Sequence, residues 1–257
     1  MKLVAIIPAR YGATRFPGKA LHVIAGKPLV QHVWERCREA KRLDEVIIAT
    51  DDMRIAEAAF GFGAEVALTR ADHQSGTDRV AEVAATLGKK FTHVLNVQGD
   101  EPTVSPSLID RLTEALKKDK KLEMVTAANV ITDQAEIENP NCVKVVLANS
   151  GEALYFSRSV IPHPFGQSAD NAAPGVTYLR HQGIYGYERD LLARFVRWKP
   201  SDYERIERLE QLRALEHGVR IRVIVNADLS VGVDAPEDVA RAEEQLAVFS
   251  GSSVAST

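Results

Sequence analysis

Cysteine is scarce in this chain, with 2 among 257 residues. Cys37 and Cys142 are too few for a disulfide scaffold, and their spacing matches no metal or redox motif, so we expect two buried thiols. No apolar run approaches the roughly 18 residues that a membrane-spanning helix needs. The apolar stretch near the start is short and leads directly into a polar loop, unlike a signal peptide. These features indicate a cytoplasmic protein with no membrane partner.

A strong charge imbalance is also missing. The net charge is −3, which gives no large basic surface and argues against a nucleic-acid partner. The chain is 45% hydrophobic and 26% charged, as is typical of globular proteins and not of disordered ones. We predict a single domain over residues 1–249, with a mobile tail over 250–257 that has nothing to bury.

Acidic residues are absent from Met1 to Trp34, a stretch that holds five cations: Lys2, Arg10, Arg15, Lys19 and Lys27. Within it, Leu3–Ile7 is an uninterrupted apolar run, typical of a strand buried on both faces of a parallel sheet. A loop with three of the cations and two glycines follows this run. A basic loop at the carboxyl end of a buried strand predicts a triphosphate site, and a solvated basic turn is the alternative.

Strands and helices alternate through the first half of the chain. Strands are predicted at 3–7, 46–49, 65–68 and 94–97, and helices at 28–40, 52–60, from about 75 and from 105. This order predicts a three-layer α/β fold, with a mostly parallel sheet between helices. Ligands bind such sheets at the carboxyl ends of the strands. We therefore expect the polar loops 8–19, 69–79 and 98–102 to converge on one site.

The pattern changes after Met124. Apolar runs at 143–147 and 153–156 flank the turn sequence Asn149-Ser150-Gly151, which predicts a hairpin. The stretch 181–187 alternates like a strand. We predict an antiparallel insertion at about 140–188 that closes over the substrate and makes the dimer contact.

Near the end of the chain, a capping box predicts one helix from Ser201 to Gly218. Within it, Glu210 lies beside the apolar stripe Ile206, Leu209, Leu212 and Leu215, where a helix edge could face a cavity or solvent.

Several polar residues could carry chemistry. The forked guanidinium group of arginine and the compact charge of lysine both suit phosphate oxygens. Arg10, Arg15 and Lys19 are therefore the candidates for binding phosphate. Magnesium, which a triphosphate site requires, prefers one or two carboxylates plus phosphate oxygens. Asp100, in a Gly-Asp turn, is the first candidate ligand, and Asp234 is the second, although it could cap a helix instead.

Four other residues are candidates for substrate contacts. The Gln98 amide ends the same strand as Asp100 and could bind a base edge. Ser75 could contact the nucleotide or cap a helix with Asp78. His181 and Tyr185 lie on one side of a strand by the period of two.

Eight sequence blocks carry a family resemblance. They are Ile7–Lys19, Ala71–Thr77, Asn96–Pro102, Asn141–Val146, Tyr155–Arg158, Gly183–Tyr187, Glu210–Arg213 and Gly232–Asp234. In this number and order they resemble the 3-deoxy-manno-octulosonate (KDO) cytidylyltransferases. The resemblance implies a nucleotide-diphospho-sugar transferase (Rossmann-like) fold, a homodimer, CTP and KDO as substrates, Mg²⁺, and a role in lipopolysaccharide biosynthesis.

The same resemblance implies roles for individual residues. It assigns the phosphates to Arg10, Arg15 and Lys19, the cytidine to Ser75 and Gln98, and the metal to Asp100 and Asp234. It assigns the sugar acid to Arg79, His181, Tyr185, Glu210 and Gln211. In the implied reaction the anomeric hydroxyl of KDO attacks the α-phosphorus of CTP, with Arg15, Lys19 and Asp100 as the catalytic residues.

Two positions depart from the family pattern. Ala13 replaces a usual serine, and Gln182 replaces an apolar residue beside His181, a change that could alter the sugar pocket. A related enzyme for 8-amino-8-deoxy-KDO or another sugar acid is the alternative, although Asp72-His73-Gln74 favours KDO. A sugar-1-phosphate nucleotidyltransferase is a further alternative, but its glycine-rich opening differs. A CTP-binding regulatory module is the non-enzymatic alternative.

Overall fold

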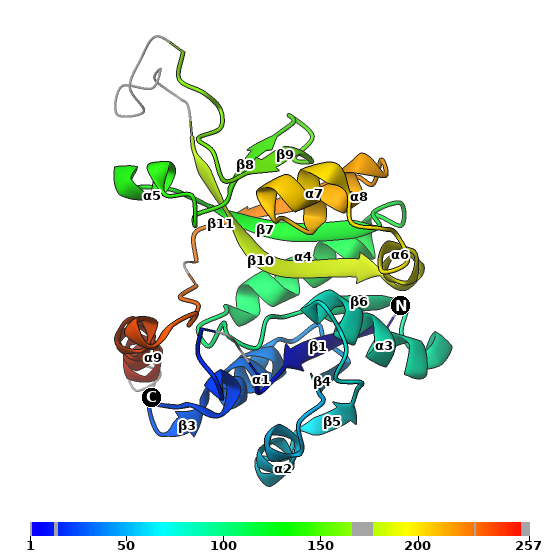
Figure 1. Ribbon diagram of the computed structural model, residues 1–257, viewed down its shortest axis with the longest axis vertical. Helices are drawn as coiled ribbons and strands as arrows, with labels where there is room; N and C mark the ends of the chain where they lie inside the picture. Colours follow the sequence, from blue (N-terminus) through cyan, green and yellow to red (C-terminus); the bar gives the residue numbers. More distant parts are fainter. Residues whose placement is uncertain (1, 13–14, 166–176, 229, 253–257) are drawn as a thin grey trace. The chain divides into compact units, whose positions relative to one another are not determined.

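The computed structural model describes residues 2–12, 15–165, 177–228 and 230–252 (Figure 1). Its chain forms two compact units. The first comprises residues 1–113 and 229–257, and the second comprises residues 114–228. Ala13 and part of the predicted 140–188 insertion lie outside the described residues.

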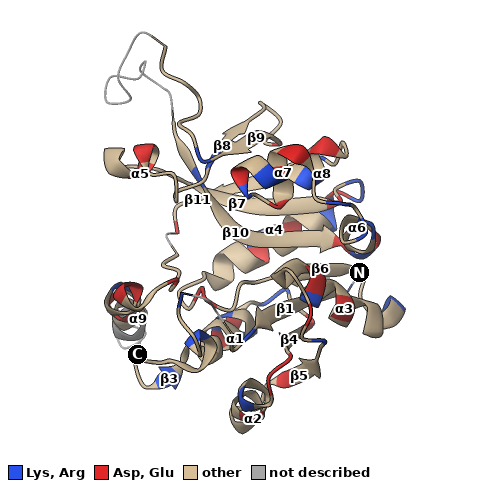
Figure 2. Ribbon diagram, viewed as in Figure 1, with Lys and Arg blue, Asp and Glu red and all other residues tan. Residues whose placement is uncertain are grey.

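The first unit contains four parallel strands in the order β6-β1-β4-β5. They span Leu3–Ala9 (β1), Glu45–Thr50 (β4), Glu65–Leu68 (β5) and His93–Asn96 (β6). Residues 3–7 are fully buried, and Figure 2 shows β1 without charge along its length. Burial of apolar surface on both faces stabilises this central strand, as the uninterrupted run predicts.

Three helices connect these strands: α1 (Leu29–Glu39), α2 (Met53–Gly61) and α3 (Gly76–Thr86). The Asp52 carboxylate caps α2, and a Ser75–Asp78 capping box opens α3. The strand order requires α1 and α2 to cross in one direction and α3 in the other. Right-handed crossovers therefore place α1 and α2 on one face of the sheet and α3 on the opposite face, which gives the predicted three layers.

Short elements complete the first unit: η1 (Lys19–Leu21), β2 (Val23–Ile24), β3 (Lys27–Pro28), η2 (Gly88–Lys90) and η4 (Pro236–Asp238). Helix α4 spans Pro106–Lys118, and the final helix α9 spans Val239–Ser252. Helix α9 packs through Ala242 and Leu246 against Ile24 and Leu29. The backbone of α9 includes the first three residues of the predicted tail, and 253–257 lie outside the described residues.

The second unit contains β7 (Met124–Val130), β8 (Lys144–Leu147), β9 (Ala153–Ser157), β10 (Leu179–Glu188) and β11 (Ile221–Asn226). Strand β10 pairs antiparallel with β7 and β8, whereas β11 pairs parallel with β7. Strands β8 and β9 form the predicted hairpin, whose turn places Gly151 at φ +81. The predicted antiparallel pairing is therefore confirmed, and the closing and dimer roles of the insertion stay predictions.

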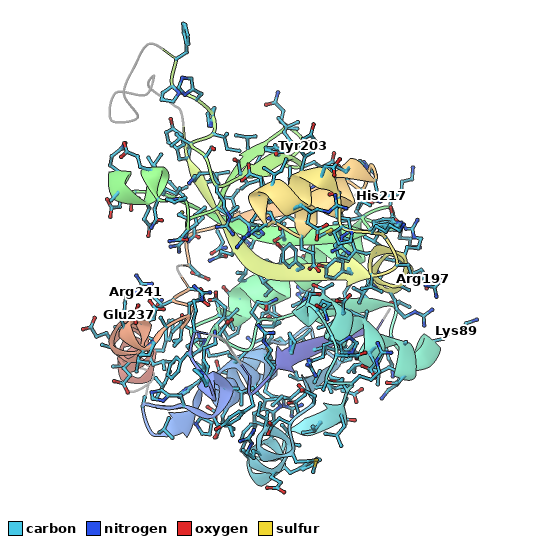
Figure 3. The ribbon with its side chains drawn as sticks, in the orientation of Figure 1. Lys89, Arg197, Tyr203, His217, Glu237 and Arg241 are labelled. Carbon is cyan, nitrogen blue, oxygen red and sulfur yellow. The ribbon has the colours of Figure 1, made fainter. Side chains whose placement is uncertain are left out.

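The helices of the second unit are α5 (Gln134–Glu138), α6 (Arg189–Phe195), α7 (Asp202–Glu207) and α8 (Gln211–Glu216). The prediction of one helix from Ser201 to Gly218 is wrong, because Arg208 adopts φ +54 and ends α7. The break turns Ile206 out of the predicted stripe, and its side chain is 79% exposed. Tyr203, on the same helix, is also exposed (Figure 3).

No helix in the described part of the chain is both long and apolar enough to cross a membrane.

Candidate functional site

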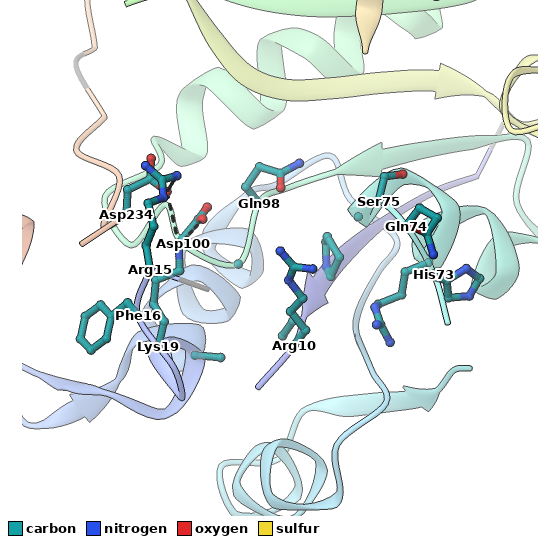
Figure 4. A pocket seen from close by; sticks show the side chains of 16 residues that line it. Arg10, Arg15, Phe16, Lys19, His73, Gln74, Ser75, Gln98, Asp100 and Asp234 are labelled. Carbon is teal, nitrogen blue, oxygen red and sulfur yellow. Dashed lines mark hydrogen bonds and ion pairs between the residues drawn. The ribbon is translucent and has the colours of Figure 1, made fainter. Parts of the chain in front are cut away.

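A pocket of about 360 Å³ opens in the first unit, at the carboxyl ends of β1 and β6 (Figure 4). Loops far apart in sequence line it, as the positions of the polar loops predict. Of the predicted residues, the pocket brings together Arg10, Arg15, Lys19, Ser75, Arg79, Gln98, Asp100 and Asp234. Its size suits a small organic ligand with several phosphates.

Two glycines shape the pocket wall. A Cβ on Gly99 would lie 2.7 Å from the backbone oxygen of Pro8, so only glycine allows these two loops to approach so closely. Gly18 adopts φ +73, and its N–H donates to the Tyr11 carbonyl at 2.8 Å. This bond closes the basic loop back on itself just before Lys19.

Cations and carboxylates meet on one side of the pocket. Lys19 Nζ donates to Asp100 Oδ2 at 2.6 Å and lies 3.5 Å from Asp234 Oδ1. The Arg15 guanidinium lies 3.1 Å from the same Asp234 oxygen. Figure 4 shows these side chains gathered together. Three sequence-distant segments thus supply one charged cluster.

The donor set of this cluster can be tested against magnesium. Among the described residues, no group of three or more His, Cys, Asp or Glu could hold a metal by itself. Magnesium needs fewer, because it usually binds through one or two carboxylates plus substrate phosphates. Asp100 and Asp234 share Lys19 as a partner and line the same pocket, so they fit that requirement.

Arg10 and Gln98 occupy the middle of the pocket. The Arg10 guanidinium is exposed, forms no hydrogen bond or ion pair with another described residue, and points into the same space as the Gln98 amide (Figure 4). Gln98 Nε2 donates to Asn96 Oδ1 at 3.2 Å, and Asn96 in turn donates to Thr77. The Gln98 amide is therefore oriented by hydrogen bonds that lead through Asn96 to Thr77.

Ser75 caps helix α3. Its hydroxyl donates to Asp78 Oδ2 at 3.0 Å and accepts from the Asp78 N–H at 3.1 Å. The capping alternative considered for Ser75 is therefore present, and Ser75 also lines the pocket. Its contact with a nucleotide stays a prediction.

Arg79 is buried in the pocket wall. Its guanidinium lies 2.8 Å from Asp51 Oδ1, and it also donates to the Thr69 hydroxyl and to the Arg70 carbonyl. These contacts tie α3 to the ends of β4 and β5. Arg79 thus braces the wall, and its predicted contact with the sugar acid stays a prediction.

Sequence reasoning assigned no role to His73, which lines this pocket, or to the pair formed by Tyr11 and Arg54. The His73 ring contacts Glu82, a hydrogen bond that lowers the pKa of that carboxyl. Tyr11 lies under the Arg54 guanidinium, 3.3 Å from ring centroid to Cζ, and Asp52 holds Arg54. His73 falls within a recognised sequence block, but nothing local marks the pairing of Tyr11 with Arg54.

The other predicted residues belong to the second unit. His181 Nε2 and Thr126 Oγ1 are 2.9 Å apart, and the ring packs between Phe156 and Tyr185, with centroids at 5.0 and 5.3 Å. Burial lowers the pKa of the His181 imidazole to about 3, so the ring is neutral at physiological pH. His181 and Tyr185 are therefore neighbours, as the strand period predicts.

Tyr185, Glu210 and Gln211 add to this group. Burial, and then the Glu210 charge, raise the pKa of the Tyr185 hydroxyl. Gln211 is buried, and its Nε2 has no hydrogen-bond partner within the described part of the chain. A buried amide donor without a partner is costly, which makes Gln211 a candidate for a ligand contact.

The two departures from the family pattern have different outcomes. Ala13 lies outside the described residues. Gln182 points away from His181, because its Nε2 donates to the Asp228 carbonyl at 3.1 Å and its Oε1 accepts from Asn226 at 3.0 Å. Gln182 therefore holds the end of β11 in place.

Comparison with known proteins gives consistent matches. The cytidylyltransferase family model matches residues 4–221. A 3-deoxy-manno-octulosonate cytidylyltransferase of Pseudomonas fluorescens is 50% identical over 94% of this chain and 96% of its own. One of Geobacter sulfurreducens is 47% identical over 96% of this chain and 100% of its own.

Solved structures agree with this assignment. A CMP:2-keto-3-deoxy-manno-octonic acid synthetase complexed with CTP matches 97% of this chain and 100% of its own, with a TM-score of 0.90 and 40% identity. A Leptospira borgpetersenii cytidylyltransferase, 18% identical with a TM-score of 0.63 over 95% of this chain and 85% of its own, shares the fold. The predicted α/β nucleotidyltransferase fold is confirmed. The chain belongs to the cytidylyltransferase family, and within it to the 3-deoxy-manno-octulosonate cytidylyltransferases.

Proposed function

We propose that this chain transfers CMP from CTP to the anomeric hydroxyl of KDO and releases pyrophosphate. The observation that carries the proposal is the pocket in which Arg10, Arg15 and Lys19 face Asp100 and Asp234. In a chain of this family, such a pocket suits a nucleoside triphosphate and a divalent cation. The names of the relatives support CTP and KDO as the substrates.

In the proposed reaction the hydroxyl oxygen of KDO forms a bond to the α-phosphorus. The bond between the α-phosphorus and the bridging oxygen breaks, pyrophosphate leaves, and the hydroxyl proton is lost. Arg10, Arg15 and Lys19 neutralise the triphosphate and the leaving group, which stabilises charge in the transition state. Gln98 and Ser75 orient the cytidine, so that the α-phosphorus faces the acceptor.

Asp100 and Asp234 would hold magnesium in this proposal. When bound, magnesium supplies positive charge to the phosphate oxygens and favours deprotonation of a nearby hydroxyl. Lys19 contacts both carboxylates, at 2.6 and 3.5 Å, and would place its positive charge beside the phosphates.

Arg79, His181, Tyr185, Glu210 and Gln211 are the proposed residues for the sugar acid. Gln211 Nε2, which has no partner among the described residues, and the neutral ring of His181 support this role, because both can hydrogen-bond to a polyhydroxylated ligand. Glu210 lies 3.7 Å from the Arg213 guanidinium, which keeps its carboxylate beside this group.

The remaining predictions belong to this proposal. A KDO cytidylyltransferase would serve lipopolysaccharide biosynthesis in the cytoplasm, use Mg²⁺, and act as a homodimer. A sizing run on the purified protein tests the dimer directly.

Pyrophosphate release tests the function. CTP and Mg²⁺ are supplied in parallel with KDO, 8-amino-8-deoxy-KDO, sialic acid or a sugar-1-phosphate. We expect release with KDO to dominate. If release with another acceptor dominates, the proposed nucleotide site stands but KDO is the wrong acceptor. If no acceptor gives release, a CTP-binding regulatory module is favoured.

A further inference from the structure

A short backbone segment of the first unit, Ser230–Val233, is bonded to the stretch Asp100–Thr103. The Ser230 hydroxyl donates to Glu101 Oε2. The Val231 N–H donates to Thr103 Oγ1 at 2.7 Å, and the Val233 N–H donates to the Asp100 carbonyl at 2.9 Å. These bonds join segments about 130 residues apart, one residue before Asp234.

The two segments also lie in close contact at Gly232, which has no side chain. A Cβ on Gly232 would lie 2.9 Å from Glu101 Oε1 and 3.8 Å from the Asp100 carbonyl. The Val233 side chain is buried in the cluster with Ile24, Leu29 and Ala242. The backbone just before Asp234 is therefore held by hydrogen bonds on one side and by apolar packing on the other.

The Asp234 side chain contributes little to its own placement. It is 58% exposed, and its partners Arg15 and Lys19 lie at 3.1 and 3.5 Å. Exposed ion pairs contribute little to stability. Its backbone N–H is held by Asp238 Oδ2 at 2.9 Å on the following side. The position of its carboxylate relative to Asp100 thus depends on the backbone bonds around it.

Resting on the proposed function, we propose that Glu101 is a positioning residue that holds Asp234 beside Asp100. Ser230 is a hydrogen-bond partner of Glu101, and Thr103 bonds to Val231 in the same segment. Glu101 follows Asp100 directly and carries the same functional group. Its carboxylate contacts Ser230 and Gly232. Adjacent acidic residues therefore have two roles: Asp100 faces the ligand, and Glu101 supports the second carboxylate.

Hydrogen exchange tests this role without ligand. Exchange at residues 231–234 is compared in the wild-type protein and in Glu101→Ala, with Glu101→Gln as the conservative variant, since its amide oxygen can still accept from Ser230. Ser107→Ala is the matched control, because it removes an exposed hydroxyl that pairs with Ser105. We expect exchange to be about 10-fold faster in Glu101→Ala. It should be close to the wild-type rate in Glu101→Gln and equal to it in Ser107→Ala. Unchanged exchange in Glu101→Ala would overturn the inference.

Manganese binding measured by electron paramagnetic resonance in the presence of CTP tests the consequence. Loss of a residue that orients a metal ligand typically weakens metal binding about 10- to 100-fold. We expect Glu101→Ala to weaken Mn²⁺ binding about 10-fold, with CTP binding in EDTA unchanged. Asp234→Asn serves as the reference. Unaltered Mn²⁺ binding in Asp234→Asn would overturn the proposed metal role of Asp234, whereas the exchange result judges the role of Glu101 separately.

A double-mutant cycle adds a further test. Gly232→Ala places a methyl group against the Glu101 carboxylate and should speed exchange like Glu101→Ala. Because Glu101→Ala removes the atom that this methyl meets, the double variant should behave like Glu101→Ala alone. Additive effects on exchange would contradict the proposed contact.

Discussion

Lys19 Nζ lies 2.6 Å from Asp100 Oδ2, across 81 residues of sequence. The Lys19 side chain is only 14% exposed, and it ties the basic loop after β1 to the turn after β6. A cation assigned to phosphate and a carboxylate assigned to magnesium are thus direct neighbours. Removal of either charge should therefore disturb the same step.

Asp100→Asn should abolish most turnover. The amide keeps the shape of the side chain but loses the charge that a metal ligand and the Lys19 pair require. We expect kcat to fall roughly 10²-fold or more, which is typical when one group that stabilises transition-state charge is lost. Circular dichroism should show an intact fold, and Asp190→Asn, at an exposed carboxylate, should retain wild-type turnover. Near-normal turnover at saturating magnesium would contradict the metal role.

Gln211→Leu should weaken KDO binding without weakening the fold. The buried Gln211 Nε2 has no partner in the described chain, so an apolar side chain of similar size removes an unsatisfied donor. We expect KM for KDO to rise roughly 10-fold, KM for CTP to stay the same, and the unfolding midpoint to stay the same or rise. Gln134→Leu on α5 is the matched control. A rise in both KM values would indicate a structural role instead.

His181 should make stability depend on pH. Burial lowers its pKa to about 3, whereas an exposed imidazole titrates near 6.5. Below pH 6.5 the unfolded chain binds a proton that the folded chain does not, so stability is complete above pH 6.5 and falls as the pH drops toward 3. Between pH 7 and 5.5 this residue alone should cost about 1 kcal/mol.

The measurement is urea unfolding of wild-type protein and His181→Gln at both pH values. Glutamine can still pair with Thr126 but does not titrate. The loss of stability between the two pH values should therefore be smaller in the variant by about 1 kcal/mol. An equal loss in both proteins would show that His181 can take up a proton while folded.

Lys144→Met should destabilise the second unit. The fully buried ammonium donates to the carbonyls of Asn139, Cys142 and Arg158 at 2.9, 2.6 and 2.7 Å, and burial lowers its pKa. Methionine fills the space but leaves three carbonyls without a donor, which we expect to cost roughly 3 kcal/mol in urea unfolding. Lys121→Met, at an exposed lysine, should change stability by less than about 0.5 kcal/mol. A similar small change in Lys144→Met would mean that water replaces the ammonium.

Local signals predicted much of the fold. The apolar run at Leu3–Ile7 gave the central strand, and the Ser75–Asp78 spacing gave the capping box of α3. The Ser201–Glu204 box likewise gave the correct start of α7. The end of that helix was missed, because the break falls at Arg208, a residue that rarely adopts positive φ and carries no turn signature.

The site was also predicted only in part, because the sequence pattern places the loops but does not show which distant side chains meet. Convergence of three polar loops follows from their places at the carboxyl ends of strands in a parallel sheet, so the pocket could be expected. Contacts between distant side chains could not, since nothing near Arg79 in sequence points to Asp51 as its partner. The alternating strand pattern also did not show that Gln182 donates a hydrogen bond to the Asp228 carbonyl, because that bond depends on how β11 ends.

Gly99 contributes no side chain, charge or proton, yet its missing Cβ allows the turn before Asp100 to lie against the Pro8 carbonyl. In a library of random variants, position 99 should tolerate fewer substitutions than many of the charged positions around it. A lost charge leaves the pocket walls where they are, whereas any added carbon separates them. Engineering of new acceptor specificity in this scaffold should therefore leave position 99 unchanged and vary the second unit.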